Sequence, residues 1–191
     1  MGKVVVSQFI TVDGVVEDPG GSENLDRGGW AFEFDRGDEG DAFKMDELAK
    51  SDALLLGRTT YEGFAAAWPS RSGDPFSEKF NSMPKYVVSS TLEDPEWNNS
   101  TVLTGDLSAA VTELREKFDG DILVNGSVQL ARELGELGLV DEYRLMVFPT
   151  VLGGGKRLFG ETAATEPLRL TESRPAGETL ILIYEPAAKS D

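Results

Sequence analysis

Short apolar runs alternate with amphipathic stretches along most of the chain. Apolar runs between turn signals predict strands, and apolar positions that repeat every three or four residues predict helices. The expected strands cover residues 3–11, 53–56, 85–89, 101–104, 122–124, 143–148, 167–174 and 179–185. The expected helices cover residues 41–51, 60–67, 76–82, 108–118 and 128–137. Residues 12–40 are rich in Gly and Asp and predict a long loop that is able to cover a site.

The order of these elements predicts an α/β fold. The runs at 53–56 and 122–124 show no polar alternation, which is typical of parallel strands that helices cover on both faces. Repeated strand–helix–strand units therefore predict a three-layer α/β/α arrangement around a mostly parallel sheet. The turn at 174–178 joins the last two strands and predicts an antiparallel end. We see no repeat or linker and expect one domain over residues 1–191.

Cysteine and histidine are both absent from the chain. Their absence excludes disulfides, thiolate nucleophiles, metal sites built on Cys or His, and any Ser-His-Asp triad. Acid–base chemistry must then come from Asp, Glu, Tyr, Lys, water or a cofactor. This set of residues suits a reaction whose difficult step is carried by a bound cofactor, and we expect no metal site.

The charge balance limits the possible partners. The chain carries 18 basic and 34 acidic residues, which gives a formal net charge of −16. Nucleic acids and anionic membranes bind to clusters of Lys and Arg, so we expect neither as a partner. No apolar run is long enough to span a bilayer, and the N-terminal segment lacks the pattern of a signal peptide. We expect a cytoplasmic protein whose acidity serves solubility or adaptation to salt.

Three strand-to-helix junctions are the candidate binding segments, because ligands of open α/β sheets bind beyond the carboxyl ends of the strands. The first junction consists of Gly57, Arg58, Thr59 and Thr60. Glycine lets a backbone approach closely, arginine offers a fork for phosphate, and the threonines lie at the start of a helix. The alternative interpretation is a turn glycine followed by a threonine that caps the helix.

The second and third junctions are also open to two interpretations. The second contains Ser89 and Ser90, and the third contains Asn125, Gly126, Ser127 and Val128. Hydroxyl groups at a strand end bind ligands or serve a turn. A glycine before a helix admits a pyrophosphate to the helix amides, or it makes a tight turn in which Ser127 caps the helix. Neither GxGxxG nor GxxxxGK[ST] occurs in the sequence.

Segments around these junctions carry a family resemblance. In chain order they are LLLGRTTYEGF, PKYVVSSTL and DILVNGSVQLARELGELGLVDEYRLMVFPTVLGGGKRLF, preceded by the opening SQFITVDGVVEDPGG. Over nearly the whole chain the sequence resembles the dihydrofolate-reductase-like superfamily, and within it the reductase domain of bacterial bifunctional riboflavin-biosynthesis deaminase–reductases. The resemblance implies a dihydrofolate-reductase-like mixed sheet, NADPH as cofactor and a homodimer formed through the late strands. It also implies a small heterocyclic substrate similar to 5-amino-6-(5-phosphoribosylamino)uracil.

The resemblance further implies roles for individual residues. Residues expected to contact the cofactor are Gly57, Arg58, Thr59 and Thr60 at the phosphates, Ser89 and Ser90 at the 2′-phosphate, Asn125, Gly126, Ser127 and Val128 at the pyrophosphate, and Leu152 and Gly153 on the far side. Val12, Asp13 and Gly14 are expected to border the nicotinamide and the substrate. Tyr61 and Trp68 flank the helix after the first junction, and we expect them either to form a wall of the substrate pocket or to belong to the core.

Reduction of a C=O or C=N bond needs a proton as well as a hydride, and the donor has three candidates. Asp41 lies seventeen residues before Arg58, where reductases that resemble this chain carry an acid. It also lies in a segment rich in carboxylates and equally suits a solvated helix face. Asp13 is the second candidate, although it is also typical of a turn before Gly14. Water is the third.

The chain departs from the bifunctional enzymes in one respect. It has no zinc-deaminase half, since the motifs H-x-E and P-C-x-x-C need histidine and cysteine. Two alternatives to a riboflavin-type reductase therefore stay open. One is a pterin or dihydrofolate-type reductase, which requires a buried acid such as Asp41, and the other is a nucleotide-binding homologue without turnover.

Overall fold

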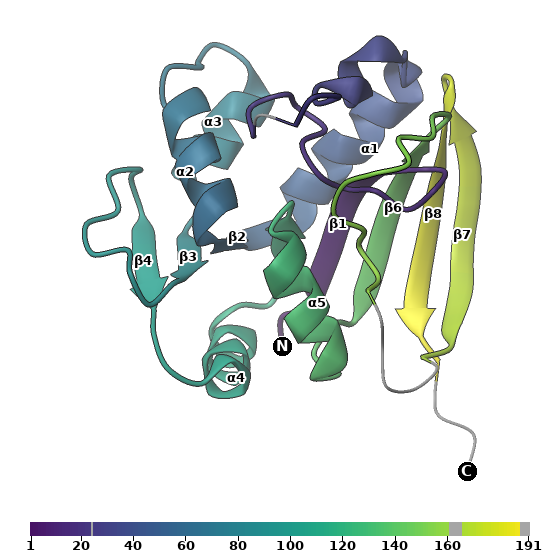
Figure 1. The fold of residues 1–191 in the computed structure, drawn as a ribbon. Coiled ribbons are helices and arrows are strands. Elements are labelled where there is room, and N and C mark those ends of the chain that lie inside the picture. Colours follow the sequence, from purple (N-terminus) through teal and green to yellow (C-terminus); the bar gives the residue numbers. More distant parts are fainter. Residues whose placement is uncertain (24, 161–165, 188–191) are drawn as a thin grey trace.

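The computed structural model of the protein describes residues 1–23, 25–160 and 166–187. These residues form one eight-stranded sheet in the order β4-β3-β2-β5-β1-β6-β8-β7 (Figure 1). The strands are β1 (Val4–Thr11), β2 (Ser51–Gly57), β3 (Lys85–Val88), β4 (Ser100–Leu103), β5 (Asp121–Asn125), β6 (Glu142–Phe148), β7 (Leu168–Ala176) and β8 (Thr179–Pro186). Neighbours from β4 to β6 pair in parallel, and β8 runs antiparallel to both β6 and β7. The prediction of a mostly parallel sheet with an antiparallel end is confirmed.

The helices fall where the periodicity predicts them, and every boundary except the start of the first helix lies within two residues of its predicted position. They are α1 (Gly37–Lys50), α2 (Arg58–Ala67), α3 (Pro75–Ser82), α4 (Leu107–Lys117) and α5 (Val128–Glu136). Helix α1 begins four residues before its predicted start. The Asp35 carboxylate accepts a hydrogen bond from the Gly37 amide at 2.7 Å, and Asp38 and Glu39 complement the helix dipole in the first turn. The predicted loop at 12–40 therefore ends earlier, and it also contains a short 3-10 helix, η1 (Trp30–Glu33).

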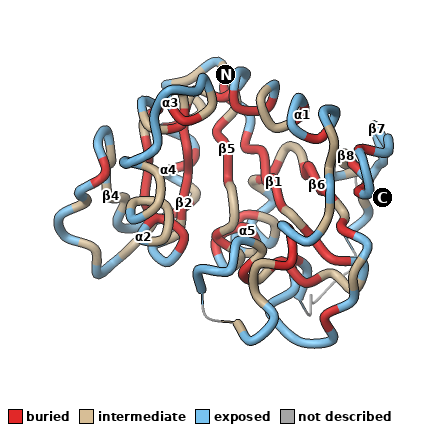
Figure 2. The backbone as a smooth tube through the Cα atoms, turned by 90° about the horizontal axis from the view of Figure 1, so that it is seen from above, coloured by how far each residue is buried: buried red, intermediate tan, exposed pale blue. Residues whose placement is uncertain are grey.

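Helices cover both faces of the sheet, as the unbroken apolar strands predict. On β1, Val4 and Val6 belong to the hydrophobic cluster that α4 and α5 close, and Val5 belongs to the opposite cluster that α1, α2 and α3 close. Figure 2 shows the buried strands β1, β2 and β5 between more exposed helices and loops. A third cluster, around Trp30 and Phe148, packs the loop that follows β1 against β6. The three-layer α/β/α fold is confirmed. None of the helices in the described residues combines the length and apolar character that crossing a bilayer requires.

The pairing of β1 leaves part of this strand uncovered at one end of the sheet. It pairs with β5 only as far as Ser7 and Asn125, but it pairs with β6 as far as Thr11 and Phe148. The last four residues of β1 therefore extend beyond the end of β5, where the chain turns away into α5. Because β1, β2, β3 and β5 are parallel, their carboxyl ends meet at this edge of the sheet.

Candidate functional site

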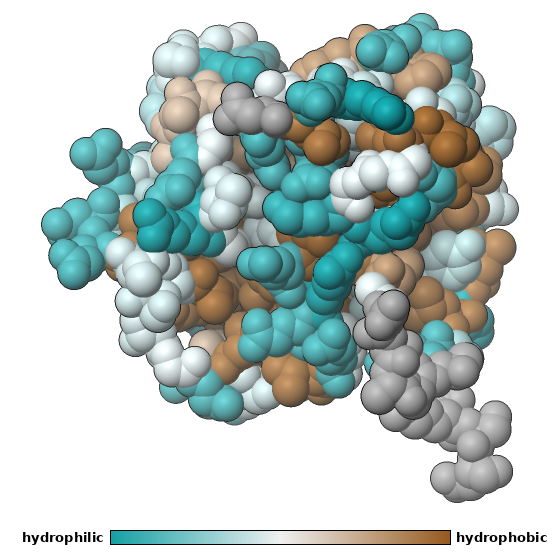
Figure 3. All heavy atoms as spheres, in the orientation of Figure 1, coloured by the Kyte–Doolittle hydropathy of each residue, from teal (hydrophilic) through white to brown (hydrophobic). Residues whose placement is uncertain are grey.

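A large cleft opens at the carboxyl ends of the parallel strands. Its volume is about 1350 Å³, and it exceeds the roughly 300–1,000 Å³ of pockets that hold drug-sized ligands. The residues of the first and third predicted junctions that line it are Gly57, Arg58, Thr59, Thr60, Asn125, Gly126, Ser127 and Val128. Segments almost seventy positions apart in the sequence therefore meet on one cleft, as the parallel strands predict. Figure 3 shows hydrophilic residues gathered across the middle of this face of the molecule.

The charges on the cleft differ from those of the whole chain. Five basic and five acidic residues line it, in a protein whose net charge is −16. The basic residues are Arg36, Lys44, Arg58, Arg71 and Lys156, and the acidic ones are Asp18, Glu23, Asp41, Asp74 and Glu133. The cleft wall is thus close to neutral, which lowers the electrostatic cost of binding an anionic ligand to an acidic protein.

The first and third junctions are bonded to one another. Gly126 and Ser127 are both left-handed, with φ of 57° and 50°. This backbone turns the Ser127 amide to the Thr60 hydroxyl at 2.8 Å, and the Ser127 hydroxyl accepts from the Gly57 amide at 2.9 Å. A Cβ at Gly126 would lie 3.0 Å from the Thr60 methyl group, so glycine permits both the turn and the close approach. The two helix starts are therefore held in one fixed relation.

The helices that begin at these junctions have no side-chain caps. Helices α3 and α4 are capped by the carboxylates of Asp74 and Asp106, but the N-cap residues of α2 and α5, Gly57 and Ser127, make no side-chain bond to the first turn. Ser127 thus occupies the N-cap position after a tight turn, as the alternative interpretation of the third junction predicts, but its side chain does not cap the helix. At the first junction the N-cap residue is Gly57, so the alternative in which a threonine caps the helix is wrong. The Ser127 hydroxyl is engaged with Gly57 and with the Asn125 carbonyl instead. Uncapped first turns carry the free amides and positive dipole end that bind phosphates.

Arg58 joins the first junction to the second. Its Nε donates to Glu62 at 2.7 Å and its Nη1 donates to Thr91 at 2.6 Å, and about half of the side chain is exposed. Ser89 accepts hydrogen bonds from the amides of Thr91 and Leu92, as its interpretation as a turn residue predicts. Neither Ser89 nor Ser90 lines the cleft, which Val88 reaches from the same strand end. A role for the two serines at a 2′-phosphate stays a prediction.

The floor of the cleft contains residues that the sequence did not single out. Ser7, Gln8 and Phe9 line it from β1, and Lys44 lines it from α1. The Gln8 side-chain amide donates to the Gly126 carbonyl at 2.5 Å, and the Lys44 ammonium donates to the Ser7 hydroxyl at 2.9 Å. A signal for them existed, because two polar residues interrupt the apolar run of the first strand. In a buried strand such residues need polar partners, and here they face the cleft.

Asp13 lies apart from the cleft lining, in a packed corner. Its carboxylate accepts from the Thr11 hydroxyl at 2.6 Å and from the amides of Leu152 and Gly153 at 3.2 and 2.8 Å. The Thr11 hydroxyl is the main cause that lowers the pKa of Asp13 to about 2, burial opposes it, and the amides of Gly153 and Leu152 lower the pKa further. The carboxyl group is therefore ionised at neutral pH, and the expectation that it donates a proton is not supported.

The neighbours of Asp13 in the sequence share this corner. An isolated bridge between Val15 and Arg157 joins the two loops, and Val12 is largely exposed. The structure brings Asp13 together with Leu152 and Gly153. Neither these residues nor Val12 and Gly14 line the cleft. Their contact with a nicotinamide or a substrate stays a prediction.

The last two candidates have different surroundings. Asp41 lines the cleft, but its side chain is largely exposed and accepts a hydrogen bond from Arg36 Nε at 2.5 Å. It is not the buried acid that a pterin reductase requires. Tyr61 does not line the cleft, because its ring is buried against Trp97 and its hydroxyl accepts from the Trp97 amide at 3.0 Å. Tyr61 belongs to the core, and its assignment to the substrate site is corrected. Trp68 does reach the cleft.

No group of Asp and Glu side chains in the described parts of the chain is arranged to hold a metal ion.

Comparisons with known proteins bear on the family and the fold of the chain. The model of the RibD C-terminal domain family matches residues 2–182. The uncharacterized protein YyaP of Bacillus subtilis (strain 168) is 27% identical over 186 residues, which cover 95% of this chain and 93% of that protein.

Two solved structures have the same fold. One is a protein of Shewanella sp. PV-4 that is named for riboflavin biosynthesis, with a TM-score of 0.78 and 22% identity over 97% of this chain and 99% of that chain. The other is a diaminohydroxyphosphoribosylaminopyrimidine deaminase/5-amino-6-(5-phosphoribosylamino)uracil reductase of Thermotoga maritima, with a TM-score of 0.64 and 14% identity. This chain is covered to 97% in that comparison but spans only 57% of the Thermotoga protein.

Proposed function

Because the chain belongs to the RibD C-terminal domain family, we propose that it is an NADPH-dependent reductase of a small heterocyclic substrate. The proposed substrate class is that of 5-amino-6-(5-phosphoribosylamino)uracil, the compound named for the Thermotoga relative. A single observation carries the proposal beyond family membership. Two uncapped helix starts, fixed to one another by Thr60 and Ser127, open on one large cleft.

The phosphate groups of NADPH fit the residues at these helix starts. The first-turn amides of α2 and α5 would bind the pyrophosphate, since amides at a helix start attract anions without a charged side chain. Arg58 lies beside them with a half-exposed side chain. Its Nη2 donates no hydrogen bond within the described residues, so it is available to a phosphate oxygen. A cleft of about 1350 Å³ leaves space for a second, small molecule beside a dinucleotide.

The chemistry divides between the cofactor and the chain. NADPH supplies a hydride when it is bound. The absence of cysteine and histidine leaves the protein the tasks of binding, orienting and supplying a proton. The floor at Ser7, Gln8, Phe9 and Lys44 lies beside Gly126 through the Gln8 hydrogen bond. In this proposal the floor is the substrate end of the cleft.

Titration of the protein with NADPH, followed by fluorescence or calorimetry, tests the proposal. Replacing Arg58 with Ala should weaken NADPH binding about 10- to 100-fold, because a hydrogen bond to a charged group contributes roughly 1.5–3 kcal/mol. Arg169→Ala is the matched control, since this exposed arginine of β7 pairs with Glu185 away from the cleft. An NADPH affinity that is the same in both variants and the wild type would contradict the cofactor site.

Hydride transfer to a panel of aminopyrimidine, pterin and quinone acceptors tests the reaction itself. Oxidation of NADPH by the aminopyrimidines is the expected result. Preference for pterins would favour a dihydrofolate-type reductase. Tight NADPH binding without transfer to any acceptor would identify a nucleotide-binding homologue and contradict the proposed activity.

A further inference from the structure

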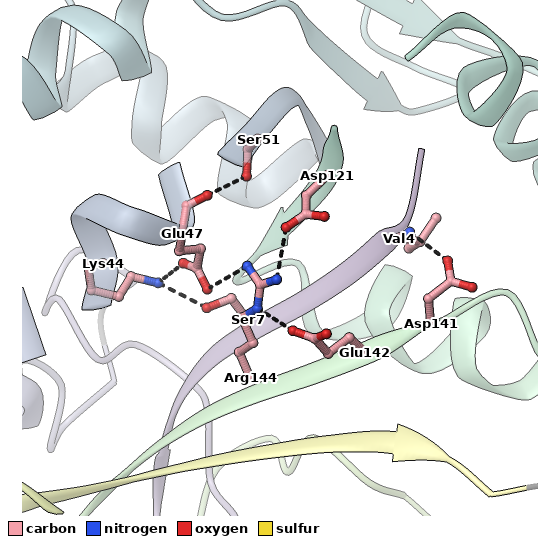
Figure 4. Close-up of polar contacts among 9 residues, drawn as sticks. All are labelled: Val4, Ser7, Lys44, Glu47, Ser51, Asp121, Asp141, Glu142 and Arg144. Atoms are coloured by element: carbon pink, nitrogen blue, oxygen red, sulfur yellow. Dashed lines mark hydrogen bonds and ion pairs between the residues drawn. The ribbon is translucent and has the colours of Figure 1, made fainter. Parts of the chain in front are cut away.

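The floor of the cleft holds an ammonium group at the end of a buried row of charges (Figure 4). The Lys44 Nζ donates to the Ser7 hydroxyl at 2.9 Å and to the Glu47 carboxylate, and the lysine side chain is 13% exposed. Lys44 lines the cleft, whereas Glu47 lies behind it with 1% of its side chain exposed. One end of this row thus faces the space in which a ligand would lie.

The row continues along one face of the sheet to Arg144 on β6. The Arg144 Nη1 lies 3.9 Å from the second carboxylate oxygen of Glu47. Its Nη2 donates to Asp121 at 2.8 Å and its Nε donates to Glu142 at 2.5 Å. Burial pulls the pKa of Arg144 down, but these three carboxylates outweigh burial and raise the pKa above its usual value. Arg144 is therefore a fixed cation, and it keeps the Glu47 carboxylate in place from behind.

Burying this row of charges does not by itself stabilise the fold. Each buried ion loses several kcal/mol of hydration, and apolar side chains of similar volume often stabilise a fold as well or better. The second oxygen of Glu47 is buried and accepts no hydrogen bond from the described residues, so the group is not fully compensated. The buried Glu47 carboxylate has one evident effect: it holds the Lys44 ammonium at a fixed point of the cleft floor.

The Lys44 ammonium also has a free donor. An ammonium group carries three N–H donors, and two of them are directed to Ser7 and Glu47. Within the parts of the chain that the structure describes, the third has no oxygen acceptor. The Phe9 ring, whose centroid lies 5.5 Å from Nζ, is the other close neighbour, and it lines the same cleft.

The position of Lys44 relative to the first and third junctions supports a role in the reaction. Ser7, its partner, pairs with Asn125 at the point where β5 ends. The next residue, Gln8, donates to the carbonyl of Gly126, which belongs to the turn that begins α5. The ammonium is thus connected to the helix start by two hydrogen bonds and one peptide unit. It lies at the end of the cleft that the proposed function gives to the substrate.

We infer that Lys44 is a catalytic residue that contacts and protonates the oxygen or nitrogen of the bond that this protein reduces. Glu47 and Arg144 are positioning residues for its ammonium. The inference rests on the proposed function, which supplies the reduced nicotinamide. The hydride adds to the carbon of a C=O or C=N group, the electron pair of the π bond moves to the oxygen or nitrogen, and a proton leaves Nζ to form the new O–H or N–H bond. The neutral amine then regains a proton from water.

The test uses the full chain and pteridine-2,4-dione, a fluorescent ring with two carbonyl groups, as the probe. Its binding is measured with and without NADP⁺, in wild type and in Lys44→Met, Lys44→Arg and Lys50→Met. Lys50 is the matched control, because it lies on the same helix but is exposed. Far-ultraviolet circular dichroism and thermal melts establish that each variant is folded, and NADPH affinity is measured separately for each.

We expect Lys44→Met to weaken binding of the probe about tenfold or more, since the substitution removes a hydrogen bond from a charged donor. Lys50→Met should change the affinity for the probe by less than about twofold. NADPH affinity should be unchanged in all variants. Lys44→Arg keeps a cation but has no proton to give at neutral pH. It should therefore bind the probe and yet lose about 10²- to 10⁴-fold in kcat on the acceptors that the wild type reduces.

Two results would overturn the inference. The first is probe binding that is absent in the wild type or insensitive to Lys44→Met, and the second is wild-type turnover in Lys44→Arg. Both differ from failure of the proposed function, which would appear in the wild type as absent NADPH binding or as NADPH that no acceptor oxidises. The probe titration without NADP⁺ reports on Lys44 in that case as well.

Discussion

Replacing Gly126 with Ala tests the contact that holds the two helix starts together. The residue has φ of 57°, and a Cβ there would lie 3.0 Å and 3.1 Å from the Cγ2 and Oγ1 atoms of Thr60. Thr60 is almost fully buried, and its hydroxyl accepts the hydrogen bond from the Ser127 amide. The substitution therefore adds a left-handed alanine and also displaces a side chain that has a fixed partner.

The strain and the displaced side chain can be separated with a control glycine that lies just after the same helix. Gly138 follows α5 with φ of 67°, and a Cβ there would meet no atom within 4 Å. Gly138→Ala should therefore cost only the left-handed strain, about 1–2 kcal/mol. Gly126→Ala should cost that amount and, in addition, about 1–3 kcal/mol for the disturbed buried hydrogen bond. For a chain of this length 1 kcal/mol corresponds to about 2–4 °C, so the two melting temperatures should differ by roughly 2–12 °C.

Thermal melts and NADPH titrations of both variants supply the measurements. In addition to its lower melting temperature, Gly126→Ala should bind NADPH at least about tenfold more weakly, because the amides of α5 would no longer be aligned with those of α2. Gly138→Ala should bind NADPH as the wild type does. Equal melting temperatures for the two variants would refute the argument that Thr60 packs too closely for a side chain at Gly126. Equal NADPH affinities would refute the role of the junction in cofactor binding.

Two further predictions concern charges outside the helix starts. Arg144→Met leaves Asp121 and Glu142 without the cation that pairs with them and leaves Glu47 with Lys44 alone. Chemical denaturation should therefore show a loss of about 3–5 kcal/mol in the free energy of unfolding, compared with less than about 1 kcal/mol for the exposed Arg169→Met. Similar losses in the two variants would contradict the structural role of the buried cation. The pKa of Asp13 is about 2, below the usual 3.8, chiefly because the Thr11 hydroxyl donates to it. Its ionised form thus stabilises the folded protein above pH 3.8, and this contribution is lost as the pH falls toward 2. Acid denaturation between pH 4 and 2 should be steeper in the wild type than in Asp13→Asn, and identical profiles would contradict the assignment.

The sequence by itself determined the architecture and the edge of the sheet at which the cleft opens. Residues such as Leu54, Leu55 and Leu56 are apolar without alternation, and only a strand covered on both faces buries them all. Parallel strands bring their carboxyl ends to one edge, so the segments at 57–60 and 125–128 could be assigned to a common site before any contact was known. These are local patterns and topological rules, and both are readable along the chain.

Only the tertiary structure decided what each candidate residue touches. Asp13 meets the amide of Gly153 from 140 positions away, and this contact adds to the Thr11 hydroxyl in lowering the pKa of its carboxyl group. Tyr61 follows the first junction in sequence, but the turn of α2 directs its ring to Trp97 in the core. In the sequence Lys44 does not differ from other lysines of an amphipathic helix, and only the fold places Ser7 of β1 beside it. Hydrogen bonds and burial depend on partners that are distant in the sequence, and no local pattern specifies which partner the folded chain will supply.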